Sequence, residues 1–332
     1  MTVVCLLLGW QTAFALSKSE ETLFAMDTYI TLTVYGKKGD KALEAAKQII
    51  SENEQKWSVS LENSEIYALN ANSSAVVSES TLKIINAALE MSEFTLGAFD
   101  PTVYPLVDVW GFTSKNYTVP SEDELETLLA RVGTENVQTD GTLVTLTNGA
   151  CLDLGGIAKG YTGDMIIDCL KEYGVKYALI NLGGNVQTLG AKPDGTKWNI
   201  GIRSPLSEEL MGAVRVANKC VITSGAYERY FETEDGVRYG HIISPFTGKP
   251  ADTGILSVTV VTDSGKVGDA LSTALFVMGK DEAISFWRAN GGFEMLILDS
   301  EGVLYITEGI YSAFTQIENE TVKSICKVST EK

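Results

Sequence analysis

Apolar and polar side chains alternate along residues 24–35, as expected of a strand with one buried face. Short apolar runs bounded by turn residues predict further strands at residues 177–182, 198–202, 214–216, 238–243 and 256–261. Asp140-Gly141 predicts a hairpin turn between residues 137 and 146, and residues 293–298 and 303–307 form a predicted closing hairpin. Strands are therefore expected along most of the chain.

Helical periodicity, with apolar residues recurring every three or four positions, separates these strands. The predicted helices cover residues 40–56, 78–94, 121–131, 158–173, 268–278 and 281–289. Ser78 is a predicted helix cap, and Ser121 opens a Ser-Glu-Asp-Glu run typical of a capping box. This interleaving, without a repeat or a linker, predicts one compact α+β domain of two lobes with mixed or antiparallel sheets and flanking helices, not a parallel-sheet nucleotide fold.

The first fifteen residues are interpreted separately from the fold. Residues 3–8 are apolar, and Ala13-Phe14-Ala15 fits the small-x-small pattern that precedes a signal-peptidase cut. No Lys or Arg precedes Lys18, so the positive segment usual in signal peptides is missing. We expect residues 1–15 to be a signal peptide and residues 20–328 to form the folded domain. This predicts an exported protein on the extracytoplasmic face of the bacterial cell envelope.

Composition narrows the class of ligand. The chain has 332 residues, 45% of them hydrophobic, which is enough to bury a large core. Its net charge of -17 argues against nucleic acid or an anionic membrane surface as a partner. An anionic ligand would then need locally arranged donors or a metal. Cys151, Cys169, Cys220 and Cys326 lack any CxxC spacing, so neither a zinc site nor a disulfide framework is predicted.

His241 is the only histidine of the chain and lies where a strand-like run enters a Pro/Gly turn. Histidine is the side chain whose ordinary pKa lies nearest neutrality, so His241 is a candidate general base. The alternative is a half-buried histidine satisfied by a backbone partner. From this residue alone the alternative is the better interpretation.

Two glycine pairs follow apolar runs. Residues 152–161 combine a strand end, the pair Gly155-Gly156 and a helix start, which brings bare backbone and free N–H groups to one place. Gly183-Gly184 ends another apolar strand. Each is either a ligand-binding turn or a tight structural turn. Neither GxGxxG nor GxxxxGK[ST] occurs, so the common nucleotide fingerprints are absent.

Asp269 and Thr273 are four residues apart in a predicted helix and therefore face the same way. A carboxylate and a hydroxyl are hard oxygen ligands that suit Mg²⁺. The alternative is that Asp269 caps the helix and Thr273 bonds back to its carbonyl.

Nine motifs, taken in order, resemble the FAD:protein FMN transferase (ApbE) family over residues 24–298. They are Ala25-Met26-Asp27-Thr28-Tyr29, Asn63-Ser64-Glu65-Ile66, residues 97–103, Trp110-Gly111-Phe112, residues 153–161, residues 181–185, Thr223-Ser224-Gly225, residues 241–250 and residues 269–276. The resemblance implies an ApbE-like, T-fold-like domain. It also implies an enzyme that cleaves FAD, attaches FMN by a phosphoester bond to a Thr or Ser of an acceptor flavoprotein subunit, and releases AMP.

The resemblance also implies roles for particular residues. Asp269 and Thr273 match the family's Mg²⁺ ligands, with the Gly156 carbonyl as third ligand, and His241 matches the base that activates the acceptor hydroxyl. The positions that match FAD-contacting residues are Met26, Ala98, Phe99, Asp100, Asp153, Lys159 and Ile243. Two departures are Ser60, where some members have a flavin-stacking Tyr worth about 0.5–1.5 kcal/mol, and Lys159, where some have Glu. A Mg²⁺-dependent FAD pyrophosphatase and a non-catalytic flavin-binding protein remain the alternatives.

Overall fold

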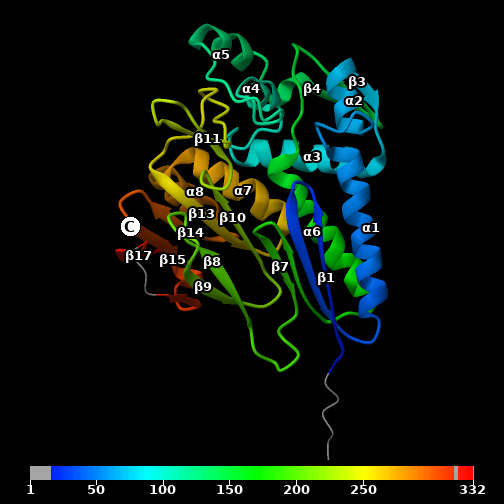
Figure 1. Cartoon of the computed structure of the whole chain (residues 1–332), viewed down its shortest axis with the longest axis vertical. Helices are drawn as coiled ribbons and strands as arrows, with labels where there is room; N and C mark the ends of the chain where they lie inside the picture. Colours follow the sequence, from blue (N-terminus) through cyan, green and yellow to red (C-terminus); the bar gives the residue numbers. More distant parts are fainter. Residues whose placement is uncertain (1–15, 318–320, 332) are drawn as a thin grey trace, which may run out of the picture.

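A computed structural model describes residues 16–317 and 321–331. The predicted signal peptide at residues 1–15 lies outside the described residues. Within the described ranges, no helix is both long enough and apolar enough to cross a membrane. Figure 1 shows two lobes, a larger one built on a long sheet and a smaller one above it that carries α2, α4 and α5.

The large lobe contains a nine-stranded sheet in the order β1-β2-β6-β7-β10-β13-β14-β15-β17. Its neighbouring strands pair antiparallel, apart from the parallel pair β15 and β17. The strands are β1 (Lys18–Ala25), β2 (Thr28–Tyr35), β6 (Tyr177–Leu182), β7 (Asn185–Leu189), β10 (Cys220–Gly225), β13 (Ile255–Thr262), β14 (Glu294–Asp299), β15 (Val303–Thr307) and β17 (Ser324–Val328).

Helices cover one face of this sheet, and a small sheet covers part of the other. The covering helices are α1 (Gly39–Trp57), α6 (Gly155–Glu172), α7 (Gly265–Met278) and α8 (Lys280–Asn290). The small sheet, in the order β16-β9-β8, consists of β8 (Trp198–Arg203), β9 (Leu210–Val216) and β16 (Phe314–Gln316), and α9 (Glu308–Tyr311) follows β15. Trp198 and Ile200 of β8 share a core with Val221 and Leu298 of the large sheet. The large sheet is therefore buried on both faces where the small sheet covers it.

The small lobe combines short helices with two small sheets. Its helices are α2 (Glu65–Asn72), α3 (Glu79–Phe94), α4 (Tyr104–Val109), α5 (Glu122–Leu129) and the 3-10 helix η1 (Thr134–Asn136). Its sheets are β3-β5-β4, made of β3 (Ser74–Val76), β4 (Val137–Asp140) and β5 (Leu143–Leu146), and the hairpin of β11 (Tyr230–Glu232) and β12 (Arg238–Gly240). Ser64, Ser78 and Ser121 cap α2, α3 and α5 through their side chains. The caps predicted at Ser78 and Ser121 are therefore confirmed.

The predicted strand at residues 24–35 is wrong in one respect, because it contains a reversal. Met26 and Asp27 have φ of 51° and 58°, and the chain turns there from β1 into β2. The left-handed region is uncommon for non-glycine residues, so alternation alone did not reveal the turn. The α+β class is confirmed, and the predicted helices form with ends displaced by up to three residues.

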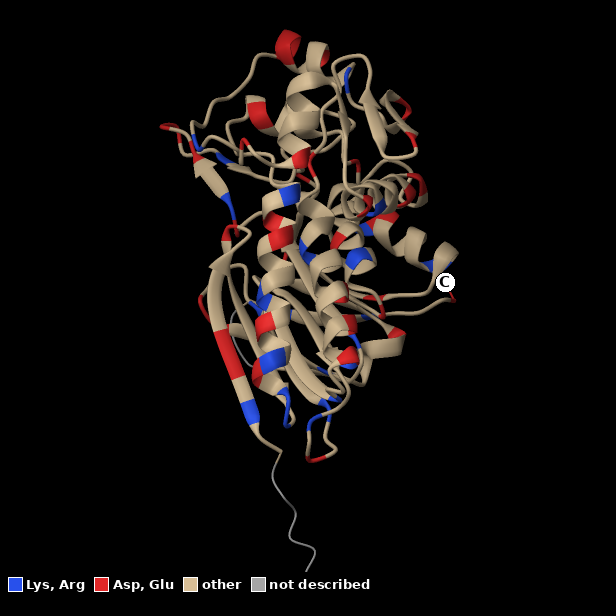
Figure 2. Ribbon diagram, turned by 90° about the vertical axis from the view of Figure 1, so that its right-hand side faces the viewer, with Lys and Arg blue, Asp and Glu red and all other residues tan. Residues whose placement is uncertain are grey.

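Figure 2 shows acidic segments on several helices and on β1, with Lys and Arg segments interspersed. In this view the acidic residues are distributed over several elements rather than gathered on one. The prediction that an anionic ligand needs locally arranged donors or a metal therefore stays a prediction.

Candidate functional site

The first turn of α6 joins the two lobes. The Asp153 N–H donates to the Pro101 carbonyl at 2.7 Å, and Asp153 Oδ1 accepts the N–H of Gly155 at 2.7 Å. Desolvation raises the pKa of Asp153, while the Gly155 N–H, Lys159 and Arg229 oppose this shift. Helix α6 thus begins at Gly155-Gly156, beside the Asp153 carboxylate, which has the positive charges of Lys159 and Arg229 near it.

Helices α6 and α7 contact each other closely where Gly160 meets Asp269. The Gly160 N–H donates to Asp269 Oδ2 at 2.8 Å. In a regular helix this N–H would be held by the Gly156 carbonyl alone. A carbonyl oxygen has two lone pairs, so the Gly156 oxygen keeps acceptor capacity beside any helical hydrogen bond. Asp269 itself is buried, with 5% of its surface exposed.

The three predicted metal-binding residues lie close together. A Cβ on Gly156 would lie 3.6 Å from Thr273 Oγ1 and 3.0 Å from the Phe99 ring, so glycine is what keeps this backbone open. Asp269, Thr273 and the Gly156 carbonyl offer only oxygen atoms as donors, which is the ligand type that suits Mg²⁺. Over the described residues, no group of three or more His, Cys, Asp or Glu side chains is placed to hold a metal ion.

Asp269 does not cap helix α7, so that part of the structural alternative is wrong. Helix α7 begins at Gly265, and the carboxylate that accepts its first N–H groups belongs to Asp164, at 2.6 Å from Gly265 N and 3.0 Å from Lys266 N. The other part of the alternative holds, because the Thr273 hydroxyl donates to the Asp269 carbonyl at 3.5 Å, which is a long hydrogen bond. Both side chains therefore keep oxygen capacity for a ligand.

Strand β10 supports this centre from the sheet. Ser224 Oγ lies 2.7 Å from Ser272 Oγ, and Ser272 Oγ donates to the Asp269 carbonyl at 2.9 Å. The Thr223-Ser224-Gly225 motif thus positions the turn of α7 that carries Asp269.

His241 is half-buried and lies at the base of the β11–β12 hairpin, with the Phe112 ring at 6.5 Å. Its Nδ1 lies 3.1 Å from the Arg229 carbonyl oxygen. A carbonyl only accepts hydrogen bonds, so Nδ1 carries the proton and Nε2 is the free acceptor. Desolvation, together with the positive charges of Arg229 and Lys159, lowers the pKa of His241 from 6.5 to about 4. The imidazole is therefore neutral at pH 7.

The predicted flavin-contacting residues occupy different environments. Met26 is half-buried and packs against two cores of the large lobe, and Lys159 donates to the Gly155 carbonyl at 3.3 Å. Ala98 and Phe99 are buried, with Phe99 against Gly156. Ile243 is buried with Leu106 and Trp110 under α4, so only its backbone is free for a ligand.

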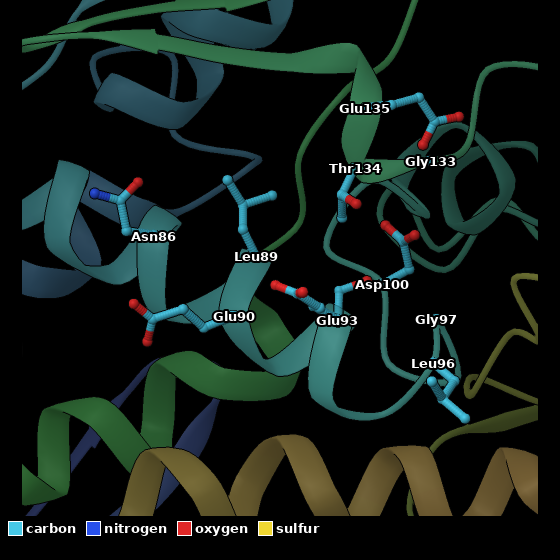
Figure 3. Close-up of a pocket in the computed structure, with 11 residues that line it drawn as sticks. Asn86, Leu89, Glu90, Glu93, Leu96, Gly97, Asp100, Gly133, Thr134 and Glu135 are labelled. Atoms are coloured by element: carbon cyan, nitrogen blue, oxygen red, sulfur yellow. The ribbon is translucent and has the colours of Figure 1, made fainter.

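Asp100 lines a different surface. It borders a cavity of about 630 Å³ that Glu90, Glu93 and Glu135 also line. Figure 3 shows its carboxylate directed toward Gly133 and Thr134. Asp100 Oδ1 accepts the Thr102 hydroxyl at 2.6 Å, and desolvation raises its pKa. The cavity is acidic and therefore unsuited to a pyrophosphate.

One buried amide beside α6 has no partner. Gln187 Nε2 donates to the Gly160 carbonyl at 3.0 Å, and Asn185, two residues earlier on β7, has a buried Nδ2 without a hydrogen-bond partner. Buried amides normally have partners, so this donor is one that a polar ligand would satisfy.

Comparisons with known proteins agree with this arrangement. A model of the ApbE family matches residues 26–297, most of the described chain. This chain belongs to the ApbE family. It is 32% identical over 336 residues to an FAD:protein FMN transferase of Treponema pallidum, covering 93% of this chain and 92% of the relative. It is 34% identical over 251 residues to one of Vibrio cholerae, covering 73% and 75%.

Solved structures of the ApbE family share the fold. The ApbE protein of Thermotoga maritima superposes with a TM-score of 0.83 at 36% identity, covering 88% of this chain and 98% of that one. The apo form of a flavinyl transferase ApbE from Pseudomonas stutzeri gives 0.81 at 28% identity, covering 89% and 96%. The predicted ApbE-like α+β fold is thereby confirmed.

Sequence reasoning missed three side chains of this ApbE site. Asp27 contacts Arg229 although the two are 202 positions apart. Glu228 Oε1 lies 3.7 Å from where a Cβ on Gly184 would be. Desolvation raises the pKa of Glu228, and the charges of Lys159 and Arg229 oppose this shift. Asp27 lies within the first quoted motif, and the charged run Glu228-Arg229 was the sequence signal for the other two.

A glycine-to-alanine change tests the helix crossing in this ApbE domain. A Cβ on Gly160 would lie 2.1 Å from the Gly265 carbonyl oxygen and 2.7 Å from Asp269 Cβ. Gly160→Ala should therefore lower the free energy of unfolding by about 1–3 kcal/mol, measured by urea denaturation. Lys171→Ala, at the exposed end of α6, is the control, with about 0.5 kcal/mol or less expected. Equal stability of the two variants would contradict this close approach.

Proposed function

We propose that the chain is a Mg²⁺-dependent FAD:protein FMN transferase. It cleaves the FAD pyrophosphate, attaches FMN by a phosphoester bond to a Thr or Ser of an acceptor flavoprotein subunit, and releases AMP. The observation that carries the proposal is the neutral His241 imidazole with its free Nε2. The proximity of Gly156, Thr273 and Asp269 supports it, and Lys159 lies near enough to influence the pKa of both His241 and Glu228.

In this mechanism the protein positions and deprotonates the nucleophile. His241 Nε2 takes the proton of the acceptor hydroxyl, whose oxygen attacks the phosphorus of the FMN half. The P–O bond to the AMP half breaks, and AMP leaves with the electron pair. Lys159 and Arg229 place positive charge near the negative pyrophosphate. Mg²⁺ held by Asp269, Thr273 and the Gly156 carbonyl would neutralise phosphate charge.

A direct assay separates the candidate functions. The purified protein is incubated with FAD, Mg²⁺ and a candidate flavoprotein subunit, and in-gel flavin fluorescence is read together with free FMN and AMP. Covalent fluorescence on the subunit with AMP release is expected. FMN and AMP accumulating without a labelled protein would favour the pyrophosphatase. FAD that stays bound and intact would favour a flavin-binding protein.

The low pKa of His241 predicts an unusual pH profile. A base works only when deprotonated, so activity is lost as pH falls through the pKa of the free enzyme, which is about 4. We expect kcat/KM for transfer to stay flat from pH 7 down to about 5 and to fall below that. The Glu228→Gln variant should show the same fall in kcat/KM at acidic pH, because Glu228 is not the assigned base. An acidic limb near the ordinary histidine value of about 6.5 would contradict the assignment.

We propose that the protein is exported and acts on the extracytoplasmic face of the cell envelope. The support is the apolar run of residues 3–8 and the Ala13-Phe14-Ala15 pattern. Mass spectrometry of protein from its native host should find a mature chain that starts near Leu16. An intact Met1 would refute cleavage.

A further inference from the structure

Arg229 contacts two parts of the molecule at once. Its carbonyl oxygen accepts the His241 backbone N–H at 3.0 Å and faces His241 Nδ1 at 3.1 Å. Its guanidinium reaches Asp27, with Nη2 at 3.0 Å from Oδ2 and 3.4 Å from the Asp27 carbonyl. One residue therefore links the proposed base to the turn between β1 and β2.

The turn between β1 and β2 is held in place by the large lobe. The Met26 N–H donates to Glu54 Oε1 of α1 at 2.6 Å, which ties the turn to the large lobe. Met26 and Asp27 both adopt the left-handed region, at φ of 51° and 58°. Non-glycine residues hold this conformation only where their surroundings determine it. The Asp27 carboxylate is thus presented from a fixed backbone.

The segment that carries His241 has less support of its own. Strands β11 and β12 pair only with each other in the described sheets, and two-stranded hairpins are marginal alone. Aromatic contacts of Phe231 and Tyr239 with Trp110 hold the body of the hairpin, with ring centroids at 6.4 Å and 5.1 Å. Arg229 directly precedes β11 and His241 directly follows β12. The base of the hairpin is therefore fixed by Arg229 and by what Arg229 contacts.

We propose that Asp27 and Arg229 are positioning residues for His241. Their ion pair fixes the hairpin base so that Nδ1–H stays on the Arg229 carbonyl and Nε2 stays the proton acceptor. The inference rests on the proposed role of His241 as general base. Both side chains are about half exposed, so the pair contributes little to stability, and its effect is on geometry.

The single histidine makes this testable by NMR without assignment ambiguity. In ¹⁵N-histidine-labelled wild-type protein we expect one tautomer, protonated at Nδ1. Asp27→Asn and Arg229→Gln should each produce a mixture with the Nε2-protonated form. Arg229→Gln should also raise the pKa of His241, since one of the two cations near it, Arg229 and Lys159, is removed.

Arg238→Gln is the matched control. Arg238 lies on the same hairpin and pairs with Glu232, with Nε at 2.8 Å from Oε2, but the structure gives it no contact with His241. This variant should keep the single tautomer. Asp27→Glu keeps a carboxylate at this position, so its histidine ¹⁵N spectrum should match that of the wild-type protein. If Asp27→Asn and Arg229→Gln both keep the Nδ1-protonated form, the proposal is overturned.

Kinetics separate this inference from the proposed function. Asp27→Asn and Arg229→Gln should lower kcat for transfer by about 10- to 10²-fold, because a misplaced catalytic group loses rate. KM for FAD should change much less in Asp27→Asn. A tautomer shift with undiminished kcat would refute the role of His241 as base while leaving its positioning by Asp27 and Arg229 established.

Discussion

His241→Ala is expected to lower the rate of FMN transfer by about 10²–10⁴-fold, the usual contribution of a positioned general base. The neutral imidazole with a free Nε2 is the group assigned to take the acceptor proton, and the chain has no second histidine to replace it. Single-turnover kinetics with FAD, Mg²⁺ and a labelled acceptor measure the loss.

FAD binding should survive in this variant, because alanine removes no anchor of the α6 or α7 turns that carry the predicted ligand-binding residues. Equilibrium quenching of flavin fluorescence provides the control, with a Kd close to that of wild type expected. A wild-type transfer rate in His241→Ala would remove the residue from the mechanism. Lost FAD binding would show instead that His241 is part of the flavin pocket.

Asp269→Asn should abolish the Mg²⁺ dependence of FAD turnover and slow transfer at least about 10²-fold. Asparagine keeps the shape and still offers an oxygen to the Gly160 N–H, but it loses the negative charge that favours a divalent cation. The stabilisation of phosphate charge at stake is several kcal/mol. Rates measured across a Mg²⁺ titration test this expectation.

Asp164→Asn is the matched control for that change. Asp164 is an acidic residue on α6 that also faces α7, but its carboxylate accepts the N–H groups of Gly265 and Lys266 at the start of α7. We expect this variant to lose some stability and to keep its Mg²⁺ dependence. If both variants respond equally to Mg²⁺, then Asp269 is a structural residue.

Local sequence patterns predicted the secondary structure well where a cap or turn residue by itself determined the local conformation. Helix caps at Ser78 and Ser121 and the Asp140-Gly141 hairpin formed as predicted, because each depends on neighbours within a few residues. The turn at Met26-Asp27 was missed, since it contains no glycine and is determined by contacts with α1 and Arg229. Strand β10 was missed for a related reason, as its pairing with β7 and β13 is non-local.

The candidate metal site shows the same division. The spacing of Asp269 and Thr273 placed them on one helical face, and the resemblance to the ApbE family added Gly156. The crossing of α6 and α7 decides which Asp269 oxygen accepts the Gly160 N–H, and Gly160 and Gly265 allow the two backbones to approach there. The sequence spacing within one helix cannot predict the distance between Gly160 and Asp269, because the two residues lie on different helices.

By itself the sequence determined the α+β class, the single histidine, the family through the resemblance of its motifs, and the oxygen character of the predicted metal-binding residues. These follow from composition, periodicity and short motifs, which act over a few residues. Only the tertiary structure decided that His241 is protonated on Nδ1, that its pKa is low, and that Asp27 faces Arg229 across the chain. The reason is physical: tautomer, desolvation and ion pairing depend on groups brought together by folding rather than by sequence.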